Sequence, residues 1–158
     1  MEAPMKDQRL NYAGIGGAVA GVVGLLGIYA DWWETETTVY HGTADISGQL
    51  ALAMSIGLFA FGAAYVLSSD QRIRRAMGAL MTLFAVVLTL ACVWGLQRTD
   101  NVAAGASTQA GLWVSLLGGV MGIAASMLAV KYAADEDASA GSVDERESDA
   151  VSHTSSTG

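Results

Sequence analysis

Apolar residues gather in four long runs, separated by shorter polar segments. The runs cover about Tyr12–Ala30, Ser47–Leu67, Ala76–Leu96 and Ala110–Val130, and none of them contains Asp, Glu, Lys or Arg. A helix that crosses hydrocarbon about 30 Å thick needs roughly 20 residues at a rise of 1.5 Å each. The pattern therefore predicts an all-α integral membrane protein whose residues 1–132 form one bundle of four transmembrane helices.

Small residues recur at every third or fourth position inside each apolar run. Such steps keep the small residues on one face of a helix, and small faces let helix backbones approach closely within lipid. We interpret these stripes as packing surfaces between helices, or between copies of the chain, rather than as the lining of a pore. The glycines expected to pack in this way are Gly14, Gly17, Gly21, Gly24, Gly57, Gly78, Gly111, Gly118 and Gly122.

The distribution of basic residues predicts the orientation of the chain in the membrane. Six basic residues flank one side of the predicted bundle, whereas Arg98 alone flanks the other. Lys and Arg accumulate in cytoplasmic loops, so both termini and the Ser68–Arg75 loop are expected in the cytoplasm of a multi-pass cell-membrane protein. The first apolar run is longer than the about 7 to 15 residues of a signal peptide, so an uncleaved helix is expected. The six topology determinants are Lys6, Arg9, Arg72, Arg74, Arg75 and Lys131.

All four tryptophans fall on the opposite, outer side in this threading. Amphipathic aromatic rings favour the depth of the lipid headgroups. We therefore predict that Trp32, Trp33, Trp94 and Trp113 anchor the outer ends of the helices at the membrane interface.

The loop of residues 31–46, DWWETETTVYHGTADI, is the most distinctive polar segment. Its β-forming residues from Thr35 to Tyr40, followed by His41-Gly42 as a turn and Thr43–Ile46 as a return, predict a short outer β-hairpin. The acids of this loop and His41 are potential metal ligands, but their spacing matches no known metal loop. A solvated acidic surface without metal or cofactor is the preferred interpretation.

The C-terminal segment, residues 133–158, carries most of the net charge of −7. It holds seven acids against Arg146 alone, and its large apolar residues are two valines. Such a composition buries too little surface to offset the entropy of ordering, which predicts a disordered, acidic, cytoplasmic tail. The chain has no basic patch of the kind that binds nucleic acid.

The predicted spans offer little chemistry. A path for ions or protons usually contains ionisable residues inside the membrane, and these runs have hydroxyls such as Thr82, Thr89 and Ser115 instead. The single cysteine, Cys92, is expected to be a packing residue. No catalytic arrangement, cofactor motif or metal motif is recognisable, so a non-enzymatic protein is expected.

Several of these elements together resemble a known family. A Trp at the outer end of the first span, a Thr- and Val-rich hairpin, Gly48 and the Arg72–Arg75 segment before a Gly/Ala/Leu span occur in this order. Over roughly Asn11–Leu96 the chain resembles the small four-span membrane proteins of actinobacteria and haloarchaea, including the tryptophan-operon-associated membrane protein family. The resemblance implies a prokaryotic plasma membrane and supplies no catalytic residues.

Two functional interpretations remain open. The first is an accessory or scaffolding subunit of a membrane complex, whose partners are the lipid bilayer and other membrane proteins or further copies of itself. The alternative is a small oligomeric channel or transporter for a neutral solute or ion, in which the Thr82/Thr89 or Ser115 stripes face a shared path.

Overall fold

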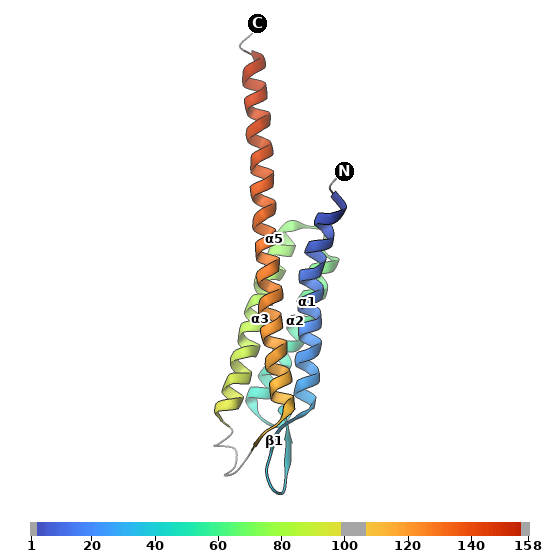
Figure 1. Cartoon of the computed structure of the whole chain (residues 1–158), viewed down its shortest axis with the longest axis vertical. Helices are drawn as coiled ribbons and strands as arrows, with labels where there is room; N and C mark the ends of the chain where they lie inside the picture. The colour runs from blue at the N-terminus through green and yellow to red at the C-terminus, as the bar shows by residue number, and fades with distance from the viewer. Residues whose placement is uncertain (1–2, 99–106, 156–158) are drawn as a thin grey trace.

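Four long helices form an up-and-down bundle in the computed structural model, which describes residues 3–98 and 107–155. They are α1 (Ala3–Tyr29), α2 (Ile46–Leu67), α3 (Gln71–Gln97) and α5 (Ala110–Ser155). Helix α1 packs along α2 and α5, and α3 packs along the same two helices, so the four make a closed square (Figure 1). The buried apolar side chains of the core lie inside this square.

Within the described part of the chain, four helical segments are long and apolar enough to cross a membrane. They are Asn11–Tyr29, Ile46–Leu67, Gln71–Gln97 and Ala110–Tyr132. The predicted helices are therefore present, close to their expected bounds, and the structure is compatible with a multi-pass membrane protein.

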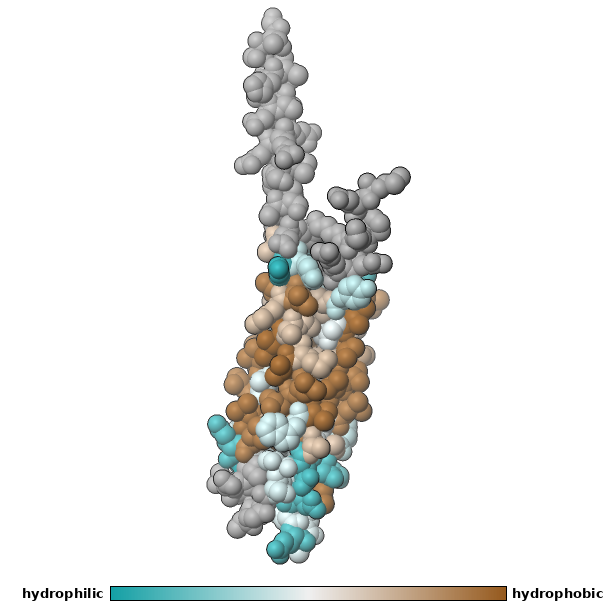
Figure 2. Space-filling model, viewed as in Figure 1, coloured by the Kyte–Doolittle hydropathy of each residue, from teal (hydrophilic) through white to brown (hydrophobic). Residues whose placement is uncertain are grey.

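The exterior of the bundle is apolar around its middle. Figure 2 shows brown, hydrophobic side chains over the central part of the visible face and hydrophilic ones gathered at the end that carries the β-strands. Large side chains on different helices point outward, including Leu26 at 65% exposure, Leu90 at 60% and Met127 at 65%. Contiguous apolar surface of this extent is rare on soluble monomers, whereas it suits a hydrocarbon surrounding.

Helix α3 begins before the position expected from the apolar pattern. The expected Ser68–Arg75 loop is wrong in its extent: the connection is short, and α3 starts at Gln71. Asp70 is its N-cap, with the Asp70 carboxylate accepting a hydrogen bond of 2.8 Å from the backbone N–H of Arg72. The cap satisfies a backbone donor that the first helical turn leaves unpaired, which explains why charged residues can belong to the helix.

A small three-stranded sheet forms at the end of the bundle that is predicted to face outward, here called the outer end. Strand β1 (Asp31–Glu34) lies in the middle, between β2 (Val39–His41) and β3 (Ser107–Thr108), and both pairings are antiparallel. A 3₁₀ turn, η1 (Gly42–Ala44), leads from β2 into α2. The sheet therefore joins the segment after α1 to the segments before α2 and α5.

The predicted hairpin exists, but its expected turn was wrong. The chain reverses between Thr35 and Thr38, where the backbone N–H of Thr35 donates to the carbonyl of Thr38 at 2.9 Å and the hydroxyl of Thr35 bonds to the same residue. His41 instead ends β2, and Gly42 opens η1. Threonines have high β propensity, but here a hydroxyl that bonds to the local backbone favours a turn.

Helix α5 includes most of the segment that was predicted to be a disordered tail. Helix α5 continues through residues 133–155 without a break, and its last part, coloured orange to red, extends beyond the ends of the other helices (Figure 1). Extending an existing helix avoids the unfavourable nucleation step, and the alanines of this segment have high helix propensity. The prediction of disorder treated the segment as an isolated chain, without the helix that precedes it.

Candidate functional site

Glycines bring the backbones of α1 and α2 into direct contact. A Cβ built at Gly21 would lie 2.5 Å from the backbone nitrogen of Phe59 and 2.8 Å from the carbonyl oxygen of Ser55, which is closer than Cβ atoms approach. At Gly14 a Cβ would lie 2.6 Å from a methyl group of Val66. These glycines line the contact between two neighbouring helices, as small residues do in membrane bundles.

The contacts of α5 depend on glycine in the same way. A Cβ at Gly118 would lie 2.6 Å from the backbone nitrogen of Gly24, and one at Gly122 would lie 2.7 Å from Leu58 and 2.9 Å from Ala85. The remaining predicted glycines also face neighbours inside the chain: Gly17 faces Met81, Gly24 faces Ser55, Gly57 faces Phe84, Gly78 faces Ala129, and Gly111 faces the carbonyl oxygens of Gly27 and Asp31. The stripes are occupied within one copy of the bundle.

Three described hydroxyls of the core bond to nearby carbonyls of their own helix. Thr82 donates to the carbonyl of Gly78 at 3.0 Å, Thr89 to that of Ala85 at 2.9 Å, and Ser126 to that of Ile123 at 2.8 Å. Ser115 instead crosses from α5 to α1 and donates to the carbonyl of Gly24 at 3.3 Å. Hydroxyls bonded in this way serve the helix backbone rather than presenting a row of donors to a passing solute.

A buried tryptophan closes the outer end of the bundle. Trp32 is fully buried, and its indole N–H donates to the carbonyl of Gly27 at 3.0 Å. A Cβ at Gly42 would lie 2.6 Å from the Trp32 ring, and one at Gly95 would lie 3.3 Å from it. Trp33 meets Trp32 edge-on, with ring centroids 5.5 Å apart. The pair fills the space where the sheet meets the helix ends.

The expected role of these two tryptophans as lipid-facing anchors was wrong, because both are buried. A register shift in the pairing of β1 between Asp31 and Trp33 interrupts the alternation of faces that a regular strand imposes. Consecutive residues can therefore both turn inward. Trp94 and Trp113 are 42% and 54% exposed, so they present their rings outside the bundle, and their anchoring role stays a prediction.

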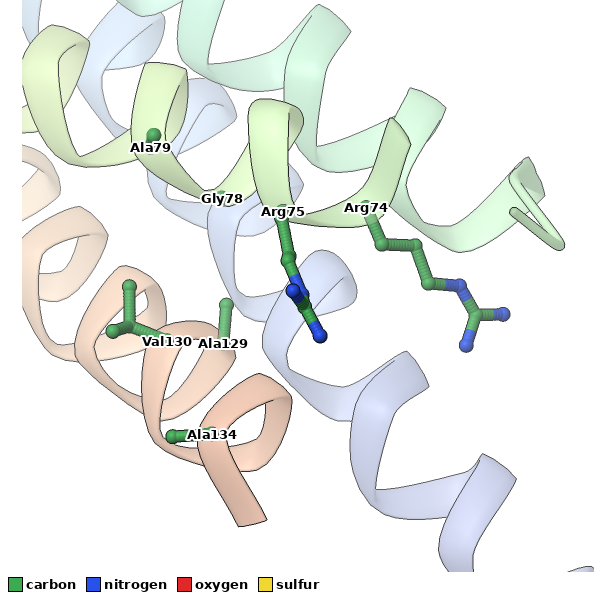
Figure 3. Close-up of a pocket in the computed structure, with 7 residues that line it drawn as sticks. All are labelled: Arg74, Arg75, Gly78, Ala79, Ala129, Val130 and Ala134. Carbon is green, nitrogen blue, oxygen red and sulfur yellow. The ribbon is translucent and has the colours of Figure 1, made fainter. Parts of the chain in front are cut away.

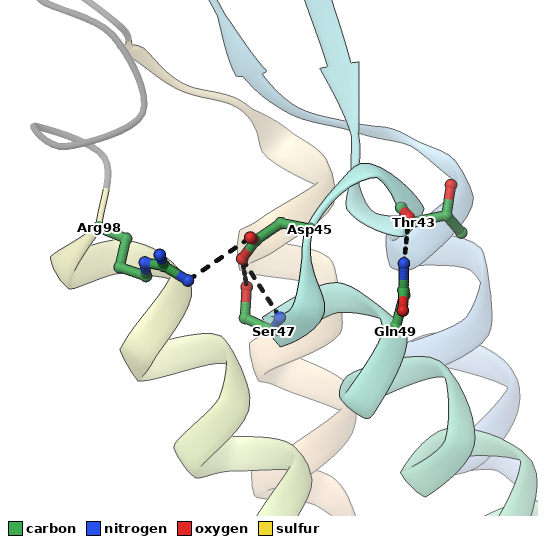
Figure 4. Close-up of polar contacts among 5 residues, drawn as sticks. All are labelled: Thr43, Asp45, Ser47, Gln49 and Arg98. Carbon is green, nitrogen blue, oxygen red and sulfur yellow. Dashed lines mark hydrogen bonds and ion pairs between the residues drawn. The ribbon is translucent and has the colours of Figure 1, made fainter.

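Asp45 connects three elements at this outer end (Figure 4). It is the N-cap of α2, and its carboxylate accepts hydrogen bonds from the backbone N–H of Ser47 at 3.2 Å and from the Ser47 hydroxyl at 2.6 Å. Its other oxygen lies 3.5 Å from a guanidinium nitrogen of Arg98, at the end of α3. Beside it, the Gln49 amide donates to the carbonyl of Thr43 at 3.4 Å. The polar groups thus hold η1, α2 and α3 together.

The surroundings of Asp45 change its acidity. Partial burial raises the pKa of the Asp45 carboxyl, but hydrogen bonds from Ser47 and from the backbone of Ile46, together with the charge of Arg98, outweigh it. The pKa of Asp45 is consequently lowered from its ordinary value of 3.8, so the group is a carboxylate at neutral pH. Sequence reasoning missed this role, although an Asp directly before an apolar run is a known N-cap pattern.

The other polar residues of the outer loops pair locally. His41 lies 3.0 Å from the carboxylate of Asp31 across the hairpin, and the side-chain amide of Gln109 donates to the carboxylate of Glu34 at 2.8 Å. Among the side chains that the structure describes, no three His, Cys, Asp or Glu residues come close enough to hold a metal ion. These contacts stabilise the sheet.

The predicted topology determinants lie at the opposite end, which is predicted to face the cytoplasm and is here called the inner end. Arg72, Arg74 and Arg75 belong to the first turns of α3, and Lys131 lies on α5. The Nε–H of Arg74 donates to the carbonyl of Ser68 at 2.6 Å, which ties the start of α3 to the end of α2. Lys6 and Arg9 belong to α1, but their side chains lie outside the described residues. Their effect on orientation stays a prediction.

In the comparisons with known proteins, the chain matches no family model, no curated protein and no solved structure. The resemblance to the tryptophan-operon-associated membrane protein family is therefore still a prediction.

Proposed function

We propose that this chain is a non-enzymatic, multi-pass membrane protein that acts as an accessory or scaffolding subunit of a membrane complex in a prokaryotic cell membrane. The observation that carries the proposal is the shape of α5. Its first part packs inside the bundle, and residues 133–155 continue as helix beyond the other helices. At 1.5 Å per residue this extension is about 35 Å long.

The composition of the extension suits recognition of a basic partner. Seven acids and one arginine lie in residues 133–155, and a concentrated charge of one sign attracts and orients an oppositely charged surface. The bundle itself supplies the membrane attachment. Its apolar exterior and glycine-mediated contacts favour a rigid support for the extension.

The alternative of an oligomeric channel finds less support in these contacts. The Thr82 and Thr89 hydroxyls bond to their own helix, and Ser115 bonds to α1. The glycines that share these stripes, Gly78, Gly111, Gly118 and Gly122, face neighbouring helices within the chain.

The test is mild-detergent purification of the tagged, full-length protein from its native membrane, followed by mass spectrometry of the co-purified proteins and a measurement of particle mass. A stoichiometric partner that disappears when residues 133–158 are deleted is the expected result. A matched variant in which the seven acids become Asn or Gln separates charge from helix length. A pure homo-oligomer, with solute flux in reconstituted vesicles, would instead establish the channel.

A further inference from the structure

A groove with two arginines at its mouth lies between α3 and α5 at the inner end of the bundle (Figure 3). Its cavity volume is about 260 Å³. Helix α3 contributes Arg74, Arg75, Gly78 and Ala79, and α5 contributes Ala129, Val130 and Ala134. Charged groups thus stand next to walls that are otherwise small and apolar.

The groove opens sideways, to the outside of the bundle. Gly78 and Ala129 are buried and form its floor. Ala79 and Arg75 are exposed, and Val130 is 55% exposed. A molecule that enters the groove would therefore come from the surroundings of the helices rather than from a path through the core.

The position of the groove along α3 matches the boundary of a membrane. The arginines come directly before Ala76, where the uncharged run of α3 begins, and Gly78 and Ala79 lie within that run. In an inserted bundle the guanidinium groups would lie at the depth of lipid headgroups, and the apolar floor would lie among acyl chains. Basic pockets between transmembrane helices at such a boundary suit anionic lipid headgroups.

The chemistry of the mouth favours phosphate. An arginine guanidinium presents donors in a planar fork that matches phosphate oxygens. The 2.6 Å bond from the Nε–H of Arg74 to the carbonyl of Ser68 uses one of the side chain's five donors and directs the arginine toward the end of α2. Asp70 caps the start of α3, and Asp135 directly follows the lining residue Ala134 in the sequence. The seven described lining residues themselves include two arginines and no acid.

We infer that this groove binds one anionic phospholipid, with its phosphate at Arg74 and Arg75 and an acyl chain against Gly78 and Ala129. The inference rests on the membrane insertion contained in the proposed function, but it needs no partner protein. The lipid would be a bound structural lipid at the inner end, between α3 and α5.

The test uses the full-length protein in mixed micelles that contain phosphatidylglycerol and phosphatidylcholine, with native mass spectrometry of the lipids retained. The wild-type protein is expected to keep one phosphatidylglycerol in preference to phosphatidylcholine. Arg75→Gln should lower this retention about fivefold, the factor that one basic residue at an anionic surface supplies. Arg72→Gln is the matched control, because Arg72 is exposed on the same helix turn and does not line the groove.

A second variant keeps the charges and fills the space. Ala79→Leu places a larger side chain on an exposed wall of the groove and should also lower retention. Equal loss in Arg72→Gln and Arg75→Gln would mean general surface attraction and would overturn the site, as would full retention in Ala79→Leu. Displacement of the lipid by millimolar inorganic phosphate would show that the groove recognises phosphate alone, and would refute the proposed binding of an acyl chain.

Flotation with liposomes distinguishes a failure of the lipid site from a failure of membrane insertion, on which the lipid site depends. If the wild-type protein fails to float with liposomes, membrane insertion itself is wrong. If it floats and shows no preference between the two lipids, the lipid site alone is refuted.

Discussion

Replacing Trp32 by alanine should destabilise the bundle more than replacing any exposed tryptophan. The Trp32 side chain is fully buried, its indole donates a 3.0 Å hydrogen bond to Gly27, and its ring lies against Gly42 and Gly95. Trp→Ala in a packed interior costs about 3 to 5 kcal/mol. The lost hydrogen bond contributes about 1 kcal/mol within that figure, since the carbonyl of Gly27 keeps a second donor, the backbone N–H of Ala30 at 3.3 Å.

The assay is equilibrium unfolding of the purified protein by SDS in mixed micelles, followed by far-UV circular dichroism. Trp32→Phe keeps most of the ring and removes the donor, so it should lose about 1 to 2 kcal/mol. Trp113→Ala is the control, because Trp113 is 54% exposed, and surface changes stay within about 0.5 kcal/mol. A loss below about 1 kcal/mol in Trp32→Ala, or an equal loss in Trp113→Ala, would refute the argument that Trp32 closes the outer end.

Three further predictions concern the helix contacts, the α2 cap and the threading. Gly21→Ala should unfold the bundle or separate α1 from α2, because the added Cβ would lie 2.5 and 2.8 Å from backbone atoms of α2. Gly78→Ala should fold normally, because its Cβ would lie 3.6 and 3.8 Å from side-chain carbons. Thermal unfolding of the two variants tests this difference. Asp45→Ala should cost about 1 kcal/mol at pH 7 through loss of the cap. The lowered pKa of Asp45 means that its stabilising charge is present above the ordinary value and is lost as pH falls through the lowered one. The cost of Asp45→Ala should accordingly shrink on acidification below about pH 4, and a cost that grows on acidification would contradict the assigned contacts. In a Cys92→Ser background, a cysteine at Ser69 should react with impermeant thiol reagents from the cytoplasmic side and one at Thr37 from the outer side; the reverse pattern would invert the threading.

The helices were predictable because membrane thickness imposes a length on each apolar run. This constraint acts on each run separately, so α2 and the charge-free parts of the others could be recognised without knowing their neighbours. The glycine stripes were predictable for the same reason, since close packing in lipid selects small residues whatever the partner helix is. What the stripes could not give is the pairing: Gly21 meets Phe59 and Gly118 meets Gly24 only because the helices form a particular square.

The outer end was less predictable, because its structure depends on contacts between distant segments. Strand β3 (Ser107–Thr108) pairs with β1 (Asp31–Glu34) from far along the chain, and two residues carry no strand pattern of their own. The inward turn of both Trp32 and Trp33 requires the irregular pairing of β1. The cap at Asp70 could have been recognised, since an Asp shortly before an apolar run favours a helix start. The contact of Asp45 with Arg98 could not, since it joins two helix ends.

The sheet and the Asp45–Arg98 contact give the two ends of the bundle different mechanical properties. At the outer end, three chain segments share one set of strand hydrogen bonds, and the ends of α2 and α3 are joined by an ion pair. At the inner end, α2 and α3 are joined by a short capped connection, and a groove lies between α3 and α5. Any change in helix tilt would therefore pivot at the outer end and have its largest amplitude at the inner one. Because residues 133–155 continue α5 as helix, a small rotation of α5 about the outer end would displace the tip of this segment further than any part of the bundle.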